Sequence, residues 1–278
     1  MKILFAAGGT GGHINPAIAT AQRIREAHPD AQILFIGTPD HMEARLVPAA
    51  GFDFKTIKIS GFYRKPTLKN ICRNIRTFFR LFTSASRSRK IIRVFAPDVA
   101  VGFGGYVSGP VLREAHKLGV KTAVHEQNAF PGMTNKILAK NADAVMVSTK
   151  AAVPYFEDCI TPVVTGLPVR EAMTGADRSS CRAKLGIPPN VPFILSMGGS
   201  LGADAVNKAV CELIALKKDD KDCIFMHAYG QYGDWVPGRL EKLGVDLKDR
   251  KDIILRSYID DMEVCMPAAD IVICRAGA

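Results

Sequence analysis

Residues 8–19 read GGTGGHINPAIA, so four glycines in five positions lead directly to a histidine, His13. They follow the apolar run Lys2–Ala7, which is typical of a buried strand, and they precede residues with helical periodicity. Glycine at a strand-to-helix turn lets the backbone approach a partner closely, and the first N–H groups of the helix attract anions. The partner is therefore either a phosphate or a neighbouring segment that packs against the turn.

Two more glycine clusters follow apolar runs, GFGGYVSG at 102–109 and GGSLG at 198–202. Three such turns at strand ends favour diphosphate binding over packing alone. The pattern GxxxxGK[ST] is absent, which argues against ATP or GTP hydrolysis, and the dinucleotide pattern GxGxxG fails at Ile14. The DxD triplet at 220–222 lies in the charged run KKDDKD, which is typical of a solvated turn, so we expect neither a metal nor a cofactor.

Strand-like and helix-like segments alternate along the whole chain, which predicts parallel sheets built from βαβ units. The pattern restarts after a polar connection near 165–182, and ILFAAGGTG at 3–11 is echoed by ILSMGGSLG at 194–202. We therefore expect two doubly wound α/β domains, 1–165 and 166–278, facing each other across a cleft. One helix is expected at 16–28, with Pro16 in its first turn. The expected strands are 2–7, 31–37, 55–59, 98–103, 121–126, 144–149, 192–197, 222–228, 252–257 and 270–274.

The net charge of +10 is concentrated in one stretch, because twelve Lys or Arg and no acidic residue lie between Asp53 and Asp98. Part of this stretch must pack as an ordinary crossover helix, but the charge exceeds what packing needs. No nucleic-acid-binding module is present. An anionic membrane surface fits better, since each basic residue held near such lipids contributes about 1 kcal/mol. The residues expected at the membrane share one helical region and are Ile75, Phe78, Phe79, Phe82, Arg73, Arg76 and Arg80.

The rest of the composition is that of a soluble globular protein. No apolar run approaches the roughly 20 residues that cross a bilayer, and the first apolar run is too short for a signal peptide. We therefore expect a protein of the cytoplasm. The seven cysteines are odd in number and form no CxxC pair, which indicates reduced thiols.

Seven strings occur in order along the chain: GGTGGHINPAIA, GFGGYVSGP, HEQNAFPGMTNK, TGLPVR, GGSLGA, YIDDM and CRAGA. Taken together, they resemble the membrane-associated N-acetylglucosaminyltransferases of bacterial peptidoglycan synthesis. The resemblance implies the GT-B architecture of two Rossmann-like domains and a peripheral position on the cytoplasmic face of the cell membrane. It also implies an inverting, metal-free transfer from UDP-N-acetylglucosamine to the muramoyl 4-hydroxyl of lipid I, undecaprenyl-diphospho-muramoyl-pentapeptide, which gives lipid II.

The resemblance also implies roles for single residues. The first two glycine turns, with Thr10, Gly11 and Gly12 and with Gly104, Gly105 and Tyr106, would face the acceptor diphosphate and the donor sugar. The third turn, with Ser200, would cradle the nucleotide. Asn128 would contact the donor sugar, and Ile259 would present its backbone to the uracil. Arg170 suits charge neutralisation on the UDP leaving group, although an ordinary linker arginine is the alternative.

His13 is the first candidate for the base, because an inverting transfer needs a group that removes the proton of the attacking hydroxyl. The alternative is a histidine that only caps the turn. Glu126 is a second candidate, either for acid–base chemistry or for orienting His13, and its alternative is an ion pair with a nearby basic residue.

The family continues past CRAGA with a helix start that holds the ribose, a glutamine pair and a final helix, so we expect an incomplete second domain and donor pocket. Two other functions stay open on these grounds. One is a UDP-N-acetylglucosamine 2-epimerase of the same architecture, and the other is a membrane-bound nucleotide-sugar-binding fragment without turnover.

Overall fold

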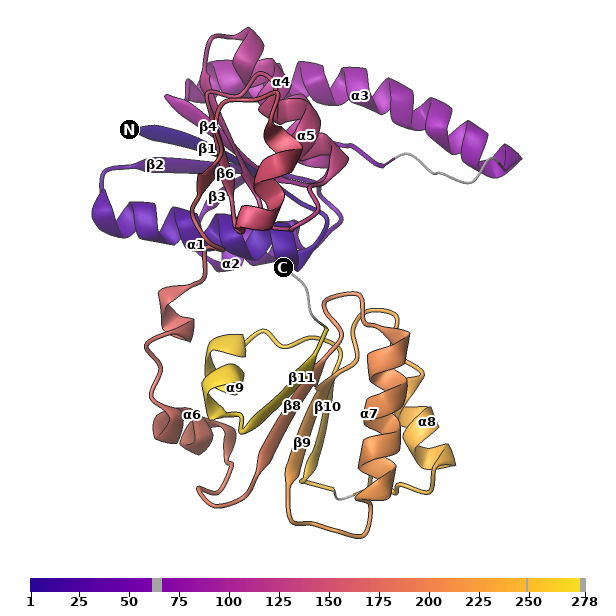
Figure 1. Cartoon of the computed structure of the whole chain (residues 1–278). Helices are drawn as coiled ribbons and strands as arrows, with labels where there is room; N and C mark the ends of the chain where they lie inside the picture. The colour runs from indigo at the N-terminus through magenta and orange to yellow at the C-terminus, as the bar shows by residue number, and fades with distance from the viewer. Residues whose placement is uncertain (62–66, 249, 276–278) are drawn as a thin grey trace. The chain divides into compact units, whose positions relative to one another are not determined.

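A computed structural model describes residues 1–61, 67–248 and 250–275. The chain forms two compact units, Met1–Arg170 and a second that begins at Glu171. The boundary expected at 165–166 lies just before this point. Each unit is a parallel sheet covered by helices (Figure 1). Parallel strands joined by helical crossovers are the architecture that the alternating sequence pattern predicts.

The first unit contains a seven-stranded sheet of order β3-β2-β1-β4-β5-β6-β7. Every strand pair in it is parallel. The strands are β1 (Lys2–Ala7), β2 (Gln32–Gly37), β3 (Asp53–Thr56), β4 (Val99–Gly104), β5 (Lys121–Glu126), β6 (Ala144–Val147) and β7 (Val163–Val164). The helices are α1 (Gly11–Ala27), α2 (Glu43–Ala49), α3 (Leu68–Phe95), α4 (Gly105–Lys117), α5 (Met133–Ala139) and the 3-10 helix η1 (Lys150–Phe156).

The interior strand β1 is buried on both faces because its side chains alternate between two helical layers. Ile3 and Phe5 pack in the core that α1 and α2 cover. Leu4 and Ala6 pack in the core on the other side, which α3 and α4 cover (Figure 1). This two-sided burial explains the continuous apolar run that marks the strand in the sequence.

The second unit has a four-stranded parallel sheet of order β10-β9-β8-β11. Helices α6 and α9 share one of its cores with the sheet, and α7 and α8 share the other. The strands are β8 (Phe193–Met197), β9 (Ile224–Ala228), β10 (Ile253–Arg256) and β11 (Ile271–Cys274). The helices are η2 (Glu171–Met173), α6 (Arg178–Leu185), α7 (Asp204–Leu216), α8 (Val236–Lys242) and α9 (Met262–Ala268).

The helix expected at 16–28 begins earlier than the sequence predicts. Helix α1 begins at Gly11, and the carbonyl of Thr10 accepts the N–H groups of His13 and Ile14 at 3.1 and 3.2 Å. Pro16 therefore lies inside the helix and not in its first turn. Gly11 and Gly12 have low intrinsic helix propensity, but the carbonyl of Thr10, which follows β1, accepts the first hydrogen bonds of the helix. The tertiary position of these residues therefore overrides their propensity.

Most expected strands agree with the structure to within two residues, and the larger differences are at β3 and β7. Strand β3 ends at Thr56, whereas the sequence pattern continues to residue 59. The two-residue strand β7 was not predicted, because two exposed valines at a sheet edge carry no periodic signal.

His227 on β9 generates a prediction about stability in the second unit. It is fully buried, and its Nδ1 lies 2.9 Å from Ser196 Oγ. Burial lowers the pKa of His227 to about 4 from an ordinary value of 6.5. Between these two values the unfolded chain binds a proton that the folded unit does not, so stability decreases as the pH falls, by up to about 3 kcal/mol.

We expect His227→Gln to remove this part of the pH dependence. The measurement is urea unfolding at about pH 7 and about pH 4.5, followed by fluorescence. The chain has a single tryptophan, Trp235, which packs in a core of the second unit and reports on that unit alone. An equal loss of stability in both proteins would contradict the assignment to His227.

Candidate functional site

The loops after β1 and β4 touch at the point where the strand order of the first sheet reverses. Gly105 has a φ of +77°, and a Cβ at this position would lie 2.3 Å from the carbonyl oxygen of Gly8. Ser108 joins the same two strands, because its Oγ lies 2.9 Å from the Ala6 carbonyl and 2.7 Å from the Gly104 carbonyl. Close backbone packing therefore explains part of the second glycine cluster, and it places both loops at the position where doubly wound sheets bind ligands.

The buried carboxylate of Glu43 fixes the first glycine loop by a hydrogen bond. Its Oε2 accepts the N–H of Gly9 at 3.2 Å, and its Oε1 accepts the N–H and the hydroxyl of Thr38 at 3.0 and 2.6 Å. Glu43 is fully buried. It thus ties the turn after β1 to the turn after β2, although the sequence did not identify it as a functional residue.

His13 lies in the first turn of α1 and is half-buried. Its ring lies against Gly104, where a Cβ would come within 3.0 Å of the imidazole. Its Nδ1 lies 2.9 Å from Oε1 of Gln127, in the loop after β5. Thr10 is the N-cap residue, but its side chain makes no capping hydrogen bond. The loops after β1, β4 and β5 therefore converge on this imidazole.

Glu126 ends β5 and is occupied by four hydrogen bonds. Its Oε1 accepts from the backbone N–H and from Nδ2 of Asn128, both at 2.8 Å. Its Oε2 accepts from the N–H of Gly132 at 3.0 Å and from Nδ2 of Asn135 at 2.9 Å. These donors take the place of the ion pair considered from the sequence. The carboxylate orients Asn128, whereas the contact with His13 is made by Gln127.

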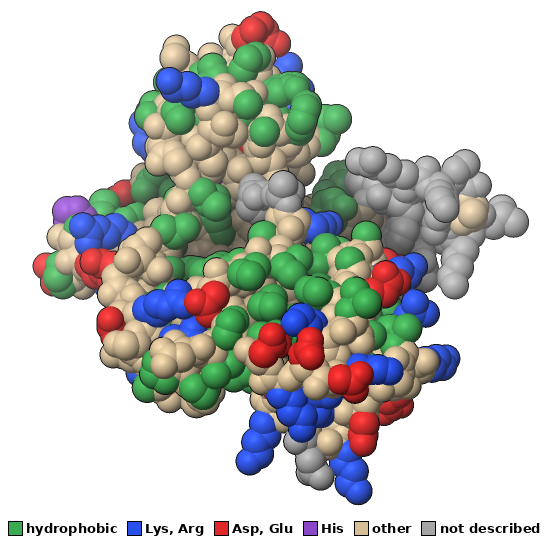
Figure 2. Space-filling view, turned by 60° about the horizontal axis from the view of Figure 1, so that its bottom comes forward, with side chains coloured by type: hydrophobic (Ala, Val, Ile, Leu, Met, Phe, Trp, Pro, Cys, Tyr) green, Lys and Arg blue, Asp and Glu red, His purple; other side chains and the backbone are tan. Residues whose placement is uncertain are grey.

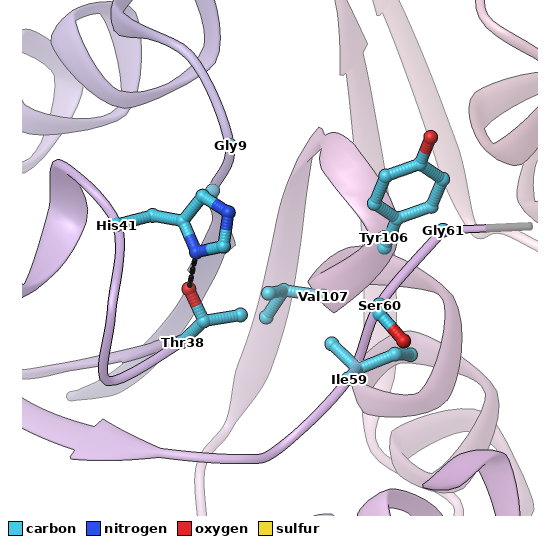
Figure 3. Close-up of a pocket in the computed structure, with 9 residues that line it drawn as sticks. Gly9, Thr38, His41, Ile59, Ser60, Gly61, Tyr106 and Val107 are labelled. Atoms are coloured by element: carbon cyan, nitrogen blue, oxygen red, sulfur yellow. Dashed lines mark hydrogen bonds between the residues drawn. The ribbon is translucent and has the colours of Figure 1, made fainter. Parts of the chain in front are cut away.

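A cavity of about 400 Å³ opens beside the first two glycine loops (Figure 3). Gly9 and His41 lie on one side of it, and Ser60, Gly61 and the exposed Tyr106 lie on the other. His41 Nδ1 lies 2.9 Å from Thr38 Oγ1. The residues that line the cavity therefore include the hydroxyl-bearing Ser60 and Tyr106 and the imidazole of His41, which are groups that bind phosphate or carboxylate oxygens.

In the second unit, the third glycine turn lies between β8 and α7. Gly202 has a φ of +86° and packs so closely on Tyr229 that a Cβ would lie 2.3 Å from its carbonyl oxygen. Ser200 is half-exposed in this turn, and α7 begins only at Asp204. The guanidinium of Arg275 lies near Gly199, 3.2 Å from the place of a Cβ there. Because β11 pairs with β8, Arg275 and this turn meet at the carboxyl end of the second sheet.

The two remaining residues predicted to contact the sugar-nucleotide donor are Ile259 and Arg170, and they differ in burial. Ile259 is buried, and its side chain belongs to a core of the second unit. Arg170 is half-buried and is the last residue of the first unit.

The predicted membrane residues lie on α3, and part of them is outside the described structure. The backbone of the helix is described, but the side chains of Arg73, Ile75, Arg76, Phe78 and Phe79 lie outside the described residues. Phe82 is 62% exposed. Arg80 is half-exposed, with Nη1 3.4 Å from Ser60 Oγ at the rim of the cavity.

Both units match domains of one glycosyltransferase family. Residues 3–147 match the glycosyltransferase family 28 N-terminal domain, and residues 193–278 match the glycosyltransferase family 28 C-terminal domain. The chain belongs to glycosyltransferase family 28. The site around His13 lies in the N-terminal domain of this family, and the turn with Ser200 lies in its C-terminal domain.

Relatives within family 28 share the whole length of this chain. A protein of Acetivibrio thermocellus, named UDP-N-acetylglucosamine--N-acetylmuramyl-(pentapeptide) pyrophosphoryl-undecaprenol N-acetylglucosamine transferase, is 45% identical over 278 residues. The match covers 100% of this chain and 73% of the relative. A protein of the same name from Caldanaerobacter subterraneus is 41% identical, and 100% of this chain matches 74% of it.

Solved structures of other proteins share the fold of this chain. The crystal structure of Acinetobacter baumannii MurG is 28% identical, with a TM-score of 0.62 over 99% of this chain and 74% of that one. A UDP-GlcNAc 2-epimerase from Neisseria meningitidis is 14% identical, with a TM-score of 0.63 over 99% of this chain and 77% of that one. At that identity the epimerase shares the fold with this family 28 chain, and nothing further follows from the likeness.

The close approach of Gly105 to Gly8 gives a prediction with a matched control. Gly105→Ala combines a left-handed backbone with a clash against a carbonyl oxygen, whereas Gly119 has a φ of +75° and open space around its Cβ position. Both alanines are strained by about 1–2 kcal/mol. We expect Gly105→Ala to lower the free energy of unfolding by about 1–3 kcal/mol more than Gly119→Ala, because the two loops must separate. Equal losses in denaturant titrations would show that the loops do not depend on this contact.

Proposed function

We propose that this protein transfers N-acetylglucosamine from UDP-N-acetylglucosamine to the 4-hydroxyl of the muramoyl sugar in undecaprenyl-diphospho-muramoyl-pentapeptide. The product would be the disaccharide lipid used in peptidoglycan synthesis. The observation that carries this proposal is the 45% identity, over the whole chain, to a relative with that activity in its name. The convergence of three loops on His13 supports it, because a transfer to a hydroxyl needs a proton acceptor beside an anion-binding turn.

The N-terminal unit would bind the acceptor. The N–H groups at the start of α1, around Gly11 and Gly12, and the turn at Gly104–Tyr106 would face the acceptor diphosphate. The two loops are already in contact and Glu43 holds one of them, so little ordering would accompany binding.

The C-terminal unit would bind the nucleotide through the turn at Ser200 and the backbone near Ile259. Arg170 would neutralise the leaving diphosphate, and Asn128, which Glu126 orients, would contact the donor sugar.

In the reaction itself, the acceptor hydroxyl oxygen forms a bond to C1 of N-acetylglucosamine from the face opposite UDP. The bond between C1 and the phosphate oxygen breaks, and its electron pair leaves with UDP. The hydroxyl proton passes to the ring of His13. The configuration at C1 is inverted because there is a single displacement.

The activity test is transfer of labelled N-acetylglucosamine to a lipid I analogue. We expect a labelled lipid product that forms only when both substrates are present. Incubation with UDP-N-acetylglucosamine alone distinguishes a transferase from a 2-epimerase, because only the epimerase would convert the nucleotide sugar without an acceptor. Binding of both substrates without product would instead indicate a binding protein.

We expect His13→Ala to lower kcat by about 10²-fold or more, the effect of removing a positioned acid–base group. The affinity for UDP should change little, because the imidazole acts on the acceptor. His28→Ala is the matched control, since His28 is an exposed histidine at the other end of the same helix. A near-normal kcat in a folded His13→Ala variant would make His13 a structural residue and leave Glu126 as the candidate base.

We also propose that α3 docks the protein on an anionic membrane surface. Its C-terminal half packs as a crossover helix, because Ile91 and Ile92 lie in the core of the first unit. Arg89 and Lys117 both pair with the buried Glu114 of α4. Burial opposes ionisation of Glu114, but these hydrogen bonds outweigh it and hold its pKa below the usual range. The C-terminal half of α3 is thus attached to the first unit, while other side chains of the helix remain exposed.

In the described part of α3, basic and apolar side chains are exposed beside the polar Thr83 and Ser86. Arg87, Lys90 and Arg93 are exposed, as are the apolar Phe82 and Val94. By contrast, the face of the molecule in Figure 2 carries basic and acidic side chains next to one another. Within the described residues, no helix has the length and hydropathy to span a bilayer. Attraction between the basic helix and acidic headgroups is therefore the interaction we propose.

Binding to vesicles tests this surface. We expect the protein to bind vesicles that contain anionic lipid and to dissociate as salt is added, because exposed charges are screened beyond about 10 Å at 0.1 M salt. Reversing Arg73, Arg76 and Arg80 to Glu should abolish binding. The control reverses Lys184, Lys208 and Lys242, three exposed residues of the second unit, and changes the net charge equally. Equal binding to neutral and anionic vesicles would contradict the electrostatic proposal.

A further inference from the structure

A chain of hydrogen bonds links His13 to two other side chains, neither of which the reaction above uses. Gln127 Oε1 lies 2.9 Å from His13 Nδ1, and Gln127 Nε2 lies 3.0 Å from His125 Nδ1. His125 Nε2 lies 3.3 Å from both the Gly166 carbonyl oxygen and Thr165 Oγ1. Gln127 and His125 are almost completely buried, at 3% and 1% exposure, so water does not replace these partners.

The orientation of the Gln127 amide is determined by a backbone group. Gln127 Nε2 lies 2.9 Å from the carbonyl oxygen of His125, which can only accept a hydrogen bond. The NH₂ group of the amide must therefore face His125, and its oxygen must face His13. A reversed amide would place two oxygens against each other in a buried position.

This orientation determines the protonation of both rings. Because Gln127 Oε1 only accepts, His13 must carry a proton on Nδ1, and in the neutral ring the lone pair is then on Nε2. Because Gln127 Nε2 donates to His125 Nδ1, the proton of His125 lies on Nε2, toward Gly166. Burial lowers the pKa of His125, which keeps this ring neutral and able to accept through Nδ1.

We propose that Gln127 is a positioning residue that holds His13 in the Nδ1–H tautomer, so that Nε2 is the atom that accepts the proton of the attacking hydroxyl. This inference rests on the proposed function for the role of His13 in transfer, but the tautomer itself follows from the hydrogen bonds alone. At the other end of this hydrogen-bond network, His125 contacts both Gln127 and the Thr165–Gly166 segment.

Proton transfer changes the ring of His13 but keeps its hydrogen bond to Gln127. When the hydroxyl proton reaches Nε2, the ring is protonated on both nitrogens, and Nδ1–H still donates to the Gln127 oxygen. The amide is neutral, so it stabilises the imidazolium less than a carboxylate would. The ring can then release the proton to solvent before the next turnover.

The test is a proton–nitrogen correlation spectrum of the whole protein labelled at histidine, which reports which ring nitrogen carries the proton. We expect wild-type His13 at neutral to mildly alkaline pH to be protonated on Nδ1. In Gln127→Met, which keeps the side-chain length but has no amide, this preference should be lost. Gln22→Met is the matched control on α1 and should leave the His13 signals unchanged. A wild-type ring protonated on Nε2 would overturn the proposal, whether or not the Met variant folds.

Kinetics supply the second readout. We expect Gln127→Met to lower kcat by about 10- to 100-fold, the range for groups that orient a functional side chain. The KM for UDP-N-acetylglucosamine should change by less than about twofold, because the tautomer acts on the transfer step. If His13→Ala keeps its kcat while wild-type His13 is the Nδ1–H tautomer, the base assignment fails and the hydrogen-bond inference stands. An unchanged kcat in Gln127→Met, with His13 needed for activity, would overturn the positioning role.

Discussion

The contact between two backbones, at Gly8 and Gly105, is the constraint on which the candidate site depends. It brings the ends of β1 and β4 together where the strand order reverses, and there is no room for a side chain between them. Gly104 thereby lies against the ring of His13, and Tyr106 reaches the cavity beside the first loop. Separating these two loops would remove the convergence of the loops after β1, β4 and β5 on the imidazole of His13.

Two buried carboxylates fix the conformation of turns that have few side chains of their own. Glu43 accepts N–H groups from the turns after β1 and β2, and Glu126 does the same in the loop after β5. Burying a carboxylate is unfavourable unless it is fully hydrogen-bonded, and here charge-assisted bonds to the backbone offset that cost. These hydrogen bonds therefore hold the turns in place before any ligand arrives.

Much of the fold follows from the sequence, because parallel strands buried on both faces leave continuous apolar runs. The three glycine clusters and His13 were also recognisable, since strand, glycine and helix occur in a fixed order. Glu43 and Gln127 were not, because their importance comes from contacts between segments far apart in the chain. In the sequence, Glu43 is one more carboxylate at the start of a helix, and Gln127 is a glutamine near a histidine. Their contacts form only because the parallel sheet brings the carboxyl ends of β1, β2, β4 and β5 to one edge. The sequence also could not separate two kinds of glycine. Gly105 is required by close packing against Gly8, whereas Gly9 is exposed with open space around its Cβ position.

We propose that the loops after β1 and β4 form one binding surface for the acceptor diphosphate. The most direct measurement is the change in backbone amide resonances when a soluble analogue of lipid I is added without any donor. The amides of residues 9–13 and of 104–106 should shift together and with one dissociation constant, and Gly119, a distant glycine of similar backbone angle, should not shift. Shifts confined to the turn at Ser200, or independent titrations of the two loops, would contradict the claim.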